Sequence, residues 1–417
     1  MAKQNKPAIR FKGFTDAWEQ RKLGELLKTI TTGKSVNSDD GAVAVGDIGI
    51  LKTSCVSYDR FNPYESKPVV KDELQSVKCA VEKDSVIVSR MNTPERVGAC
   101  GYVSTDFPNL FLPDRLWKLK FQDNVDAYFV YMMLVSSVYK EKITSMASGT
   151  SGSMYNIPKE TFLNLQLVVP VQTSEQRKIG QVLRQLNDLI TLHQRKFDKL
   201  QVLKKAMLEK MFPKNGSSVP EIRFKGFTDA WEQRKLGEVV KEVTRNDPTS
   251  EAPIMMITAN NGFIEQSERY AFDNAGESLK KYILLQKGEL AYNHGASKLR
   301  PFGSCFALTT AESARIPFVY HCFSAENQNA EFLSIELNGS EVESQLRKIV
   351  SSGARMDGLL NISFDEYSTV TVLLPDIKEQ EHIADFFRNL DHLITLHQRE
   401  LEKLQNIKKS MLEKMFV

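Results

Sequence analysis

The chain has 417 residues, of which 41% are hydrophobic and 26% charged, and its 55 Lys and Arg nearly balance its 52 Asp and Glu. This length exceeds what one ordinary core supports and predicts two or more domains. The net charge of only +3 excludes a uniformly basic chain but leaves room for a local basic face. No apolar run is long enough for a signal peptide or a membrane span, so we expect a cytoplasmic protein without membrane contact.

The cysteine and histidine positions argue against a disulfide-stabilised protein and against a metal-binding protein. The five cysteines form no C-x-x-C pair, and the six histidines do not cluster at metal-ligand spacing. A sparse, odd set of cysteines fits a reducing compartment better than a disulfide scaffold. We therefore expect no metal site in this chain.

The first predicted element is a leading segment at residues 7–25, PAIRFKGFTDAWEQRKLGE, which recurs at 220–238 as PEIRFKGFTDAWEQRKLGE. Only Ala8 and Glu221 differ across these 19 positions. Trp18 and Trp231 are interpreted as core anchors rather than base-stacking rings. The basic residues of the segment could touch phosphates, but they are the same in both copies and cannot distinguish one half from the other.

The first middle region, residues 26–172, predicts a mixed α/β domain. Short β-rich runs lie at Ser85–Ser89, Leu116–Phe121 and Leu165–Pro170, and a helical patch lies at Ala127–Met146. A Gly/Ser loop follows the helical patch. Such alternation of short strands, helices and turns is typical of an α+β fold.

A long helical segment at 173–213 comes next. Apolar residues recur at steps of three and four with charges between them, which predicts a coiled-coil helix. Pro213 ends it, and residues 214–219 form a linker. The predicted seam positions are Val182, Leu186, Leu189, His193, Phe197, Leu200, Leu203, Met207 and Met211.

The second half repeats this order. Its middle, 239–376, has β-rich runs at Phe318–Phe323 and Val370–Leu374 and a helical patch at Ala330–Val350. Its final segment, 377–417, carries LDHLITLHQR where the first helix carries LNDLITLHQR. The second predicted seam is Ile383, Phe386, Leu390, Leu393, His397, Leu401, Leu404, Ile407, Met411 and Met415.

Nearly identical flanks thus surround two dissimilar middles. Faint matches remain inside them, for example Lys83–Arg90 with Lys287–His294 and Gly98–Cys100 with Gly303–Cys305. We expect one fold with two different surfaces. Two matching helices joined by a short linker predict an antiparallel intramolecular coiled coil, so the fold class is α+β: two mixed α/β domains separated by two long helices, as a pseudo-two-fold internal repeat.

Catalytic signatures are missing from the sequence. There is no G-x-G-x-x-G, Walker A, G-x-S-x-G or H-E-x-x-H segment, so no nucleotide cradle or familiar hydrolase site is predicted. Asn62-Pro63-Tyr64 lacks the second proline of the amino-methyltransferase motif and is interpreted as a turn. Glu65-Ser66-Lys67 has a nuclease-like spacing without the Pro-Asp that would accompany it.

The repeated flanks, variable middles and coiled-coil helices together resemble the specificity subunits of type I restriction–modification systems, the HsdS family. The resemblance covers the whole chain. It rests on F-x-x-x-W-x-x-x-x-L-G-E in each leading segment, on P-x-x-x-E-Q-x-x-I at Pro375–Ile383 after the second middle, and on the same E-Q-x-x-I within Val171–Ile179, after Pro170, at the end of the first. It implies a first target-recognition domain at 1–172, a conserved helix at 173–213, a second recognition domain at 220–376 and a second conserved helix at 377–417.

The resemblance also implies a function. Each recognition domain would read one half of an asymmetric, bipartite site in double-stranded DNA, and the helices would set the spacing and dock partners. The partners would be two methyltransferase subunits and two motor–nuclease subunits. S-adenosylmethionine, ATP and Mg²⁺ would belong to those partners, and this chain would carry no catalytic site.

Loops at matching places with different sequences are the candidate DNA contacts. Base reading needs Arg, Asn, Ser and similar side chains at base edges, and phosphate contacts need basic groups. One loop lies near each domain's start, one follows the matched strand, and one is the Gly/Ser loop. The candidates in the first domain are Thr32, Lys34, Ser89, Arg90, Asn92, Arg96, Thr150, Ser151 and Ser153. Those in the second are Arg245, Asn246, Asn293, His294, Ser297, Lys298, Arg300 and Arg355.

Two other functions remain open at this point. One is a methyltransferase or nuclease with unfamiliar motifs, which would bind S-adenosylmethionine or Mg²⁺ and act alone. The other is a coiled-coil scaffold with two protein-binding domains, which would show no salt-dependent affinity for DNA.

Overall fold

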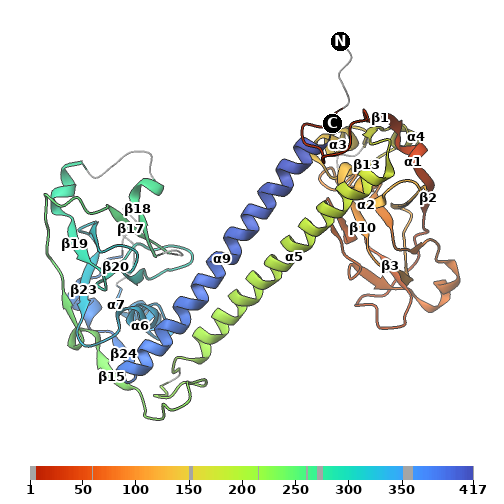
Figure 1. The fold of residues 1–417 in the computed structure, drawn as a ribbon. Coiled ribbons are helices and arrows are strands. Elements are labelled where there is room, and N and C mark those ends of the chain that lie inside the picture. The colour runs from red at the N-terminus through yellow and green to blue at the C-terminus, as the bar shows by residue number, and fades with distance from the viewer. Residues whose placement is uncertain are drawn as a thin grey trace. The chain divides into compact units, whose positions relative to one another are not determined.

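The computed structural model describes residues 6–58, 60–149, 154–214, 216–259, 262–269, 276–350 and 360–416 (Figure 1). The chain divides into two units. The first contains residues 1–195 and 398–417, and the second contains 196–397. Both long helices cross this division, so each unit holds one part of each helix.

A four-stranded antiparallel sheet, in the order β10-β8-β12-β2, forms the centre of the first unit. All five residues of β8 are buried. Val86 and Val88 pack against the buried residues of helices α2 and α3, a cluster called the helical core below, while Ile87 packs into a second cluster on the other face. That second cluster lies beneath a mixed sheet of order β6-β3-β11-β7. The strands of the two sheets are β2 (Leu27–Thr32), β3 (Gly49–Leu51), β6 (Ser66–Pro68), β7 (Ala80–Val81), β8 (Ser85–Ser89), β10 (Cys100–Val103), β11 (Phe107–Phe111) and β12 (Leu116–Phe121).

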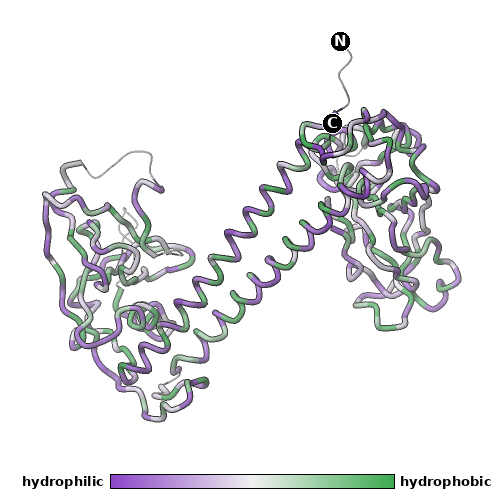
Figure 2. The backbone as a smooth tube through the Cα atoms, in the orientation of Figure 1, coloured by the Kyte–Doolittle hydropathy of each residue, from purple (hydrophilic) through white to green (hydrophobic). Residues whose placement is uncertain are grey.

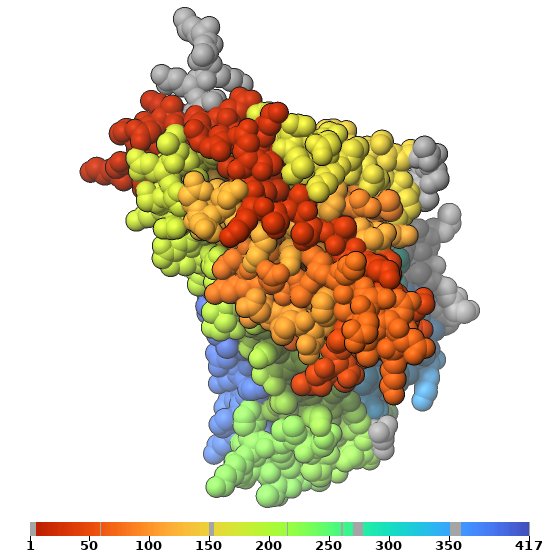
Figure 3. Space-filling model, turned by 90° about the vertical axis from the view of Figure 1, so that its right-hand side faces the viewer, coloured from red at the N-terminus to blue at the C-terminus, as the bar shows by residue number. Residues whose placement is uncertain are grey.

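The leading segment is tied to the end of the same domain. Its strand β1 (Glu19–Lys22) pairs antiparallel with β14 (Gln166–Val169), and Trp18 is buried in the helical core. Figure 3 shows the red N-terminal residues lying against the yellow and yellow-green residues of this unit. The remaining elements here are α1 (Leu23–Leu26), α2 (Ala127–Leu134), α3 (Ser137–Ser145), α4 (Lys159–Leu163), β4 (Val56–Ser57), β5 (Arg60–Phe61), β9 (Met91–Asn92) and β13 (Tyr155–Asn156).

The second unit repeats this framework around an antiparallel sheet of order β16-β23-β20-β21. Its leading strand β15 again pairs with the strand before the long helix, β24. The hairpins β17-β18 and β19-β22 complete it. Its elements are β15 (Glu232–Lys235), β16 (Val240–Glu242), β17 (Met255–Thr258), β18 (Gly262–Glu265), β19 (Ile283–Gln286), β20 (Leu290–Asn293), β21 (Ser304–Ala307), β22 (Ser313–Ile316), β23 (His321–Ala325), β24 (Thr371–Leu374), α6 (Ala330–Leu337), α7 (Ser340–Ile349) and α8 (Phe364–Ser368).

The long helices α5 (Thr173–Lys210) and α9 (Ile377–Met415) pack together and run antiparallel. In the first unit, Ile179 and Leu183 of α5 share a core with Met415 of α9. In the second unit, Met207 near the end of α5 shares a core with Ile383 near the start of α9. Figure 2 shows hydrophilic and hydrophobic residues alternating along both helices.

The seam differs from the predicted one at matching positions. Leu189 and Leu393 are 46% and 42% exposed, whereas the neighbouring Ile190 and Ile394 are partly buried. Leu203 is likewise exposed, and Lys204 beside it is partly buried and pairs with Asp391 at 2.5 Å. Predicting Leu189, Leu393, Leu203 and Ile407 as seam residues was therefore wrong. At Leu189 and Leu393 the reason is that two adjacent large apolar side chains fit the same heptad and the pattern cannot choose between them.

Both leading segments are joined to the long helices by equivalent ion pairs and backbone hydrogen bonds. Arg10 makes a two-fold ion pair with Glu175 of α5, at 2.6 and 2.7 Å, and the equivalent pair in the second unit joins Arg223 to Glu379, at 2.7 Å twice. The backbone N–H of Ile9 donates to Lys414, and that of Ile222 donates to Lys210. These N–H groups satisfy carbonyls that the helix ends leave open.

Several sequence predictions are confirmed at the level of elements. The runs Ser85–Ser89 and Leu116–Phe121 are strands β8 and β12 with those bounds. The patch Ala127–Met146 contains α2 and α3, and Ala330–Val350 contains α6 and α7. Among the described residues, no helix is long and apolar enough to cross a membrane.

Candidate nucleic-acid interface

Two candidate loops of the first unit, together with the described residues that flank the third, meet at one end of its central sheet. Thr32 at the end of β2 pairs with Trp117, while the N–H of Arg90, just after β8, donates to the carbonyl of Arg115 at 3.1 Å. Asn156, which follows the Gly/Ser loop, pairs with Met91. Loops that are distant in sequence thus share one edge, because antiparallel strands bring the end of one beside the start of the next.

The chain just after β2 is fixed by a close approach. A Cβ on Gly33 would lie 1.5 Å from the carbonyl oxygen of Leu112, so only glycine fits there. The hydroxyl of Thr32 donates to the carbonyls of Asp114 and Leu116, each at 3.0 Å. These contacts hold Thr32 to the sheet and leave Lys34, which is exposed, at the rim.

Arg90 has the arrangement expected of a binding group. Its guanidinium lies 5.9 Å from the centre of the Trp117 ring. Its Nε atom is buried and has no hydrogen-bond partner among the described residues. A partly exposed guanidinium beside an aromatic ring suits recognition of guanine or phosphate through its outer nitrogens.

The other candidates in the first unit have different surroundings. Ser89 and Asn92 are buried and bond each other at 3.0 Å, so they stabilise the turn after β8. Arg96 is exposed and lines a pocket with Arg60. Thr150, Ser151 and Ser153 lie outside the described residues.

In the second unit the segment at Leu360 meets the loop after β20, whereas the loop after β16 turns towards β19 and the start of β20. The N–H of Val243, just after β16, donates to Cys322 at 2.8 Å, and the N–H of Leu360 donates to the carbonyl of His294 at 2.9 Å. Arg245 is exposed and pairs with Glu289 at 2.6 Å. Asn246 is exposed beside it, and its side chain donates to the carbonyl of Lys280 at 3.4 Å.

His294 occupies the position of Arg90 but faces inward. It is 7% exposed, and its ring nitrogens lie 2.8 and 2.7 Å from the carbonyls of Leu360 and Val319. It also stacks on His321, whose pKa is lowered by burial. The His294 ring thus lies between two loops, within hydrogen-bonding distance of a carbonyl of each. The side chain of Asn293 is similarly used, with its amide donating to Ile257 at 3.1 Å.

The loop after Asn293 and His294 presents Ser297 and Lys298. Both are exposed, and Ser297 closes a turn by accepting from the N–H of Arg300 at 3.0 Å. Arg300 itself donates to the carbonyl of Asn338 at 2.8 Å, and burial lowers its pKa. Arg355 lies outside the described residues.

Both loops after the matched strands end on a glycine in the left-handed region. Gly98 has a φ of 81° and Gly303 a φ of 82°. Residues with a Cβ rarely adopt this conformation. The sequence match between Gly98–Cys100 and Gly303–Cys305 therefore marks the same turn in both units.

Sequence reasoning missed Arg115. It is exposed in the turn between β11 and β12, directly beside Arg90. Its counterpart in the second unit is Val319, so comparing the two halves gave no signal; a basic residue in a Pro-Asp-Arg turn between two strands was the available one. Within the described ranges, no three His, Cys, Asp or Glu side chains gather as metal ligands.

Comparison with known proteins agrees with this geometry. A family model described as the type I restriction modification DNA specificity domain matches residues 15–202. The Escherichia coli type I restriction enzyme EcoEI specificity subunit is 23% identical over 155 residues, which cover 37% of this chain and 26% of that protein. The Methanocaldococcus jannaschii type I restriction enzyme MjaVIII specificity subunit is 22% identical over 428 residues, 95% of this chain and 91% of that protein.

A solved structure shares the fold. The type I restriction–modification S subunit from M. genitalium superposes with a TM-score of 0.60 at 15% identity, and the match covers 99% of both chains. That likeness concerns the arrangement of sheets and long helices. By sequence, this chain is similar to type I restriction–modification specificity subunits, and residues 15–202 match their DNA specificity domain.

Proposed function

We propose that each unit of this specificity subunit reads one half of an asymmetric, bipartite site in double-stranded DNA. The observation that carries the proposal is that the sequence-variable loops after β2 and β8 of the first unit meet at one end of its central sheet, beside Arg115. The leading segments and long helices repeat between the units, whereas the middles that carry these loops differ. Different side chains at equivalent positions, such as Arg90 and His294, would give the two half-sites different sequences.

The long helices are the proposed spacer between half-sites. α5 has 38 residues and α9 has 39, which at about 1.5 Å per residue is roughly 57 Å for each. Half-sites read from one face of DNA are separated by a turn of about 34 Å or a multiple of it. Stiff helices hold such a spacing better than a flexible linker.

The proposed partners are two methyltransferase subunits and two motor–nuclease subunits. S-adenosylmethionine, ATP and Mg²⁺ would bind to those subunits, and this chain would contribute recognition and no catalysis. A repeated specificity chain suits two copies of one partner, since each copy can meet the same surface.

An exposed apolar stripe on the helices supports this docking. Leu189 and Leu192 are 46% and 47% exposed on α5, and their counterparts Leu393 and Leu396 are 42% and 44% exposed on α9. Leucines three residues apart share a helix face. Because the same stripe is exposed on both helices, we propose that it takes the two methyltransferase subunits.

Adjacent substitutions separate docking from folding. Leu189→Asp with Leu393→Asp is expected to weaken assembly with the methyltransferase subunit at least tenfold and to leave the melting temperature within a few degrees. Ile190→Asp with Ile394→Asp is expected to lower the melting temperature, because it puts charges into the seam. Analytical ultracentrifugation and thermal unfolding measure the two effects. Unimpaired assembly of the Leu189/Leu393 variant would disprove docking at the stripe.

The DNA-reading proposal is tested by mapping methylated adenines in a methylation-free host that expresses this chain with its methyltransferase subunit. A split motif with a fixed gap is the expected result, and exchanging residues 26–172 should alter one block of it only. If the subunits co-purify but no motif appears, the scaffold function is the better account.

Substituting a single loop residue should weaken DNA binding without abolishing it. Arg90→Ala and Arg115→Ala are each expected to weaken binding of the assembled complex to its site about tenfold, since one such contact contributes roughly 1–3 kcal/mol. Lys83→Ala, at an exposed position just before β8 and so at the opposite end of that strand from Arg90, should leave DNA affinity unchanged. Fluorescence anisotropy at fixed salt measures this; equal losses for all three variants would argue against a specific role for this edge.

A further inference from the structure

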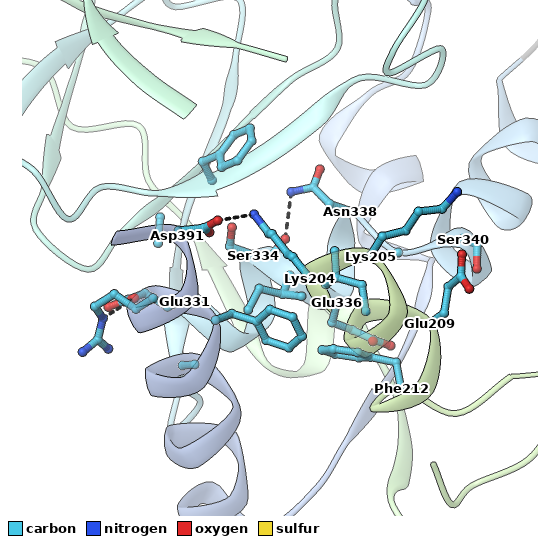
Figure 4. Close-up of a pocket in the computed structure, with 18 of the residues that line it drawn as sticks. Lys204, Lys205, Glu209, Phe212, Glu331, Ser334, Glu336, Asn338, Ser340 and Asp391 are labelled. Carbon is cyan, nitrogen blue, oxygen red and sulfur yellow. Dashed lines mark hydrogen bonds and ion pairs between the residues drawn. The ribbon is translucent and has the colours of Figure 1, made fainter. Parts of the chain in front are cut away.

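A cavity of about 530 Å³ lies in the second unit, between α6, the end of α5 and the start of α9 (Figure 4). Its apolar walls include Phe212, Phe306, Ile335 and Phe387. Cavities of about 300–1,000 Å³ are the size of ligand sites, and packing defects are far smaller. The cavity is therefore large enough to hold a ligand.

The first unit supplies a matched comparison, because α2 and α6 are equivalent helices. Each is N-capped by a side chain that accepts from the third residue on: Asp126 from Phe129 at 2.7 Å, and Asn329 from Phe332 at 2.9 Å. The backbone N–H of each cap residue donates to a glutamine of the long helix, Gln176 or Gln380. Position-by-position comparison of the two helices is thus sound.

In the first unit this space is filled by three tyrosine rings. The ring centres of Tyr102, Tyr128 and Tyr131 lie 5.0 to 6.1 Å apart. The guanidinium of Arg184 lies 5.0 Å from the centre of Tyr102 and 4.5 Å from that of Tyr128. Asn187 donates to the hydroxyl of Tyr128 at 2.6 Å.

In the second unit all three tyrosines are absent. The equivalent positions carry Ala307, Glu331 and Ser334, as the strand pairing and the helix alignment show. Glu331 binds Arg388, the counterpart of Arg184, at 2.8 Å and so replaces one ring by an ion pair. Nothing among the described residues replaces the other two rings, and the cavity is what remains.

We propose that this cavity binds a phenol ring, the side chain of a tyrosine carried by a partner protein. The aromatic walls match the environment that tyrosine rings have in the first unit. Ser334 and the carboxyl of Glu336 line the cavity and can accept a hydrogen bond from the phenol hydroxyl. Lys205 and Glu209 at the lining carry charges of both signs, which suits a polypeptide better than an uncharged free phenol.

All the residues that line the cavity belong to the second unit, and tyrosines occupy the equivalent positions of the first, so this site would bind a single copy of the partner. The proposed docking stripe recurs on both helices, whereas this cavity does not. The inference is thus independent of DNA reading and of how the methyltransferase subunits dock.

Ligand-observed NMR on the full chain, with p-cresol and N-acetyl-tyrosinamide as probes, tests the proposal. Both probes are expected to bind with millimolar affinity. Ala307→Tyr and Ser334→Tyr each restore a ring of the first unit and should weaken both probes at least tenfold. Ser267→Tyr adds a tyrosine at an exposed place in the same unit and should leave binding unchanged.

The outcomes are distinct. Equal binding to wild type and to the two filled variants would overturn the site. Binding of p-cresol without N-acetyl-tyrosinamide would overturn a polypeptide occupant, since the cavity would then admit the ring but not the backbone. Melting temperatures show whether the filled variants fold; if Ser334→Tyr does not, Ser334→Phe tests the same loss of space with a ring that lacks the hydroxyl.

Discussion

Replacing Arg223 with alanine is expected to destabilise the second unit by about 3–5 kcal/mol, the range for removing one partner of a buried ion pair. Glu379 is 1% exposed, and both its oxygens accept from the Arg223 guanidinium at 2.7 Å. The variant leaves that carboxylate buried without its counter-charge. Urea unfolding of the full chain, followed by hydrogen exchange in α9, measures the loss.

The repeat provides internal controls for this variant. Arg10→Ala should cost less than Arg223→Ala, because the indole N–H of Trp18 donates to Glu175 at 3.3 Å. The Trp231 indole N–H has no partner among the described residues. Arg234→Ala removes an exposed pair with Glu238 and should change stability very little. Equal losses for Arg223→Ala and Arg234→Ala would contradict the buried-pair argument.

Glu336→Gln is expected to stabilise the second unit at pH 8 and to have almost no effect at pH 4. Burial raises the pKa of Glu336 from 4.5 to about 7. Both folded and unfolded chains bind the proton below pH 4.5, so the full stability is present there. As the pH rises towards 7 the unfolded chain releases the proton more readily, and stability falls by at most about 3 kcal/mol.

Glutamine keeps the useful contact and removes the charge. One oxygen of Glu336 accepts from the backbone N–H of Leu373 at 3.0 Å, and an amide oxygen can do the same. The free energy of unfolding should therefore depend less on pH in the variant, as urea titrations at pH 4, 6 and 8 would report. Glu251→Gln, at an exposed position, is the matched control. A wild-type pH dependence in Glu336→Gln would refute this assignment.

The sequence predicted elements best where burial leaves little choice. The run Ser85–Ser89 became β8 because it is covered on both faces, and such strands read as continuous apolar runs. The residues at which the two long helices pack together were harder to predict. Leu189-Ile190 and Leu393-Ile394 each offer two large apolar residues, and only the packed structure decides which faces the partner helix.

At the candidate interface, too, the sequence indicated the segments better than the roles of single side chains. Matching positions between the halves selected loops of which those after β2 and β8 lie together in the first unit, and their role as DNA contacts stays a prediction. The roles of single side chains did not follow, because polar residues at strand ends also satisfy the backbone. The His294 ring lies within hydrogen-bonding distance of two carbonyls, and Arg115 escaped notice because the second half has Val319 there.

The frame of leading segments and long helices has a consequence for how new specificities arise. Its ion pairs and helix-end hydrogen bonds join repeated residues to repeated residues, as with Arg10–Glu175 and Arg223–Glu379. Most substitutions destabilise a protein, so stepwise change is limited by the stability that remains. Exchanging a whole middle region leaves these frame contacts in place. A lineage of such chains can thus replace the variable loops proposed to read DNA in one recombination event without first losing the stability of its frame.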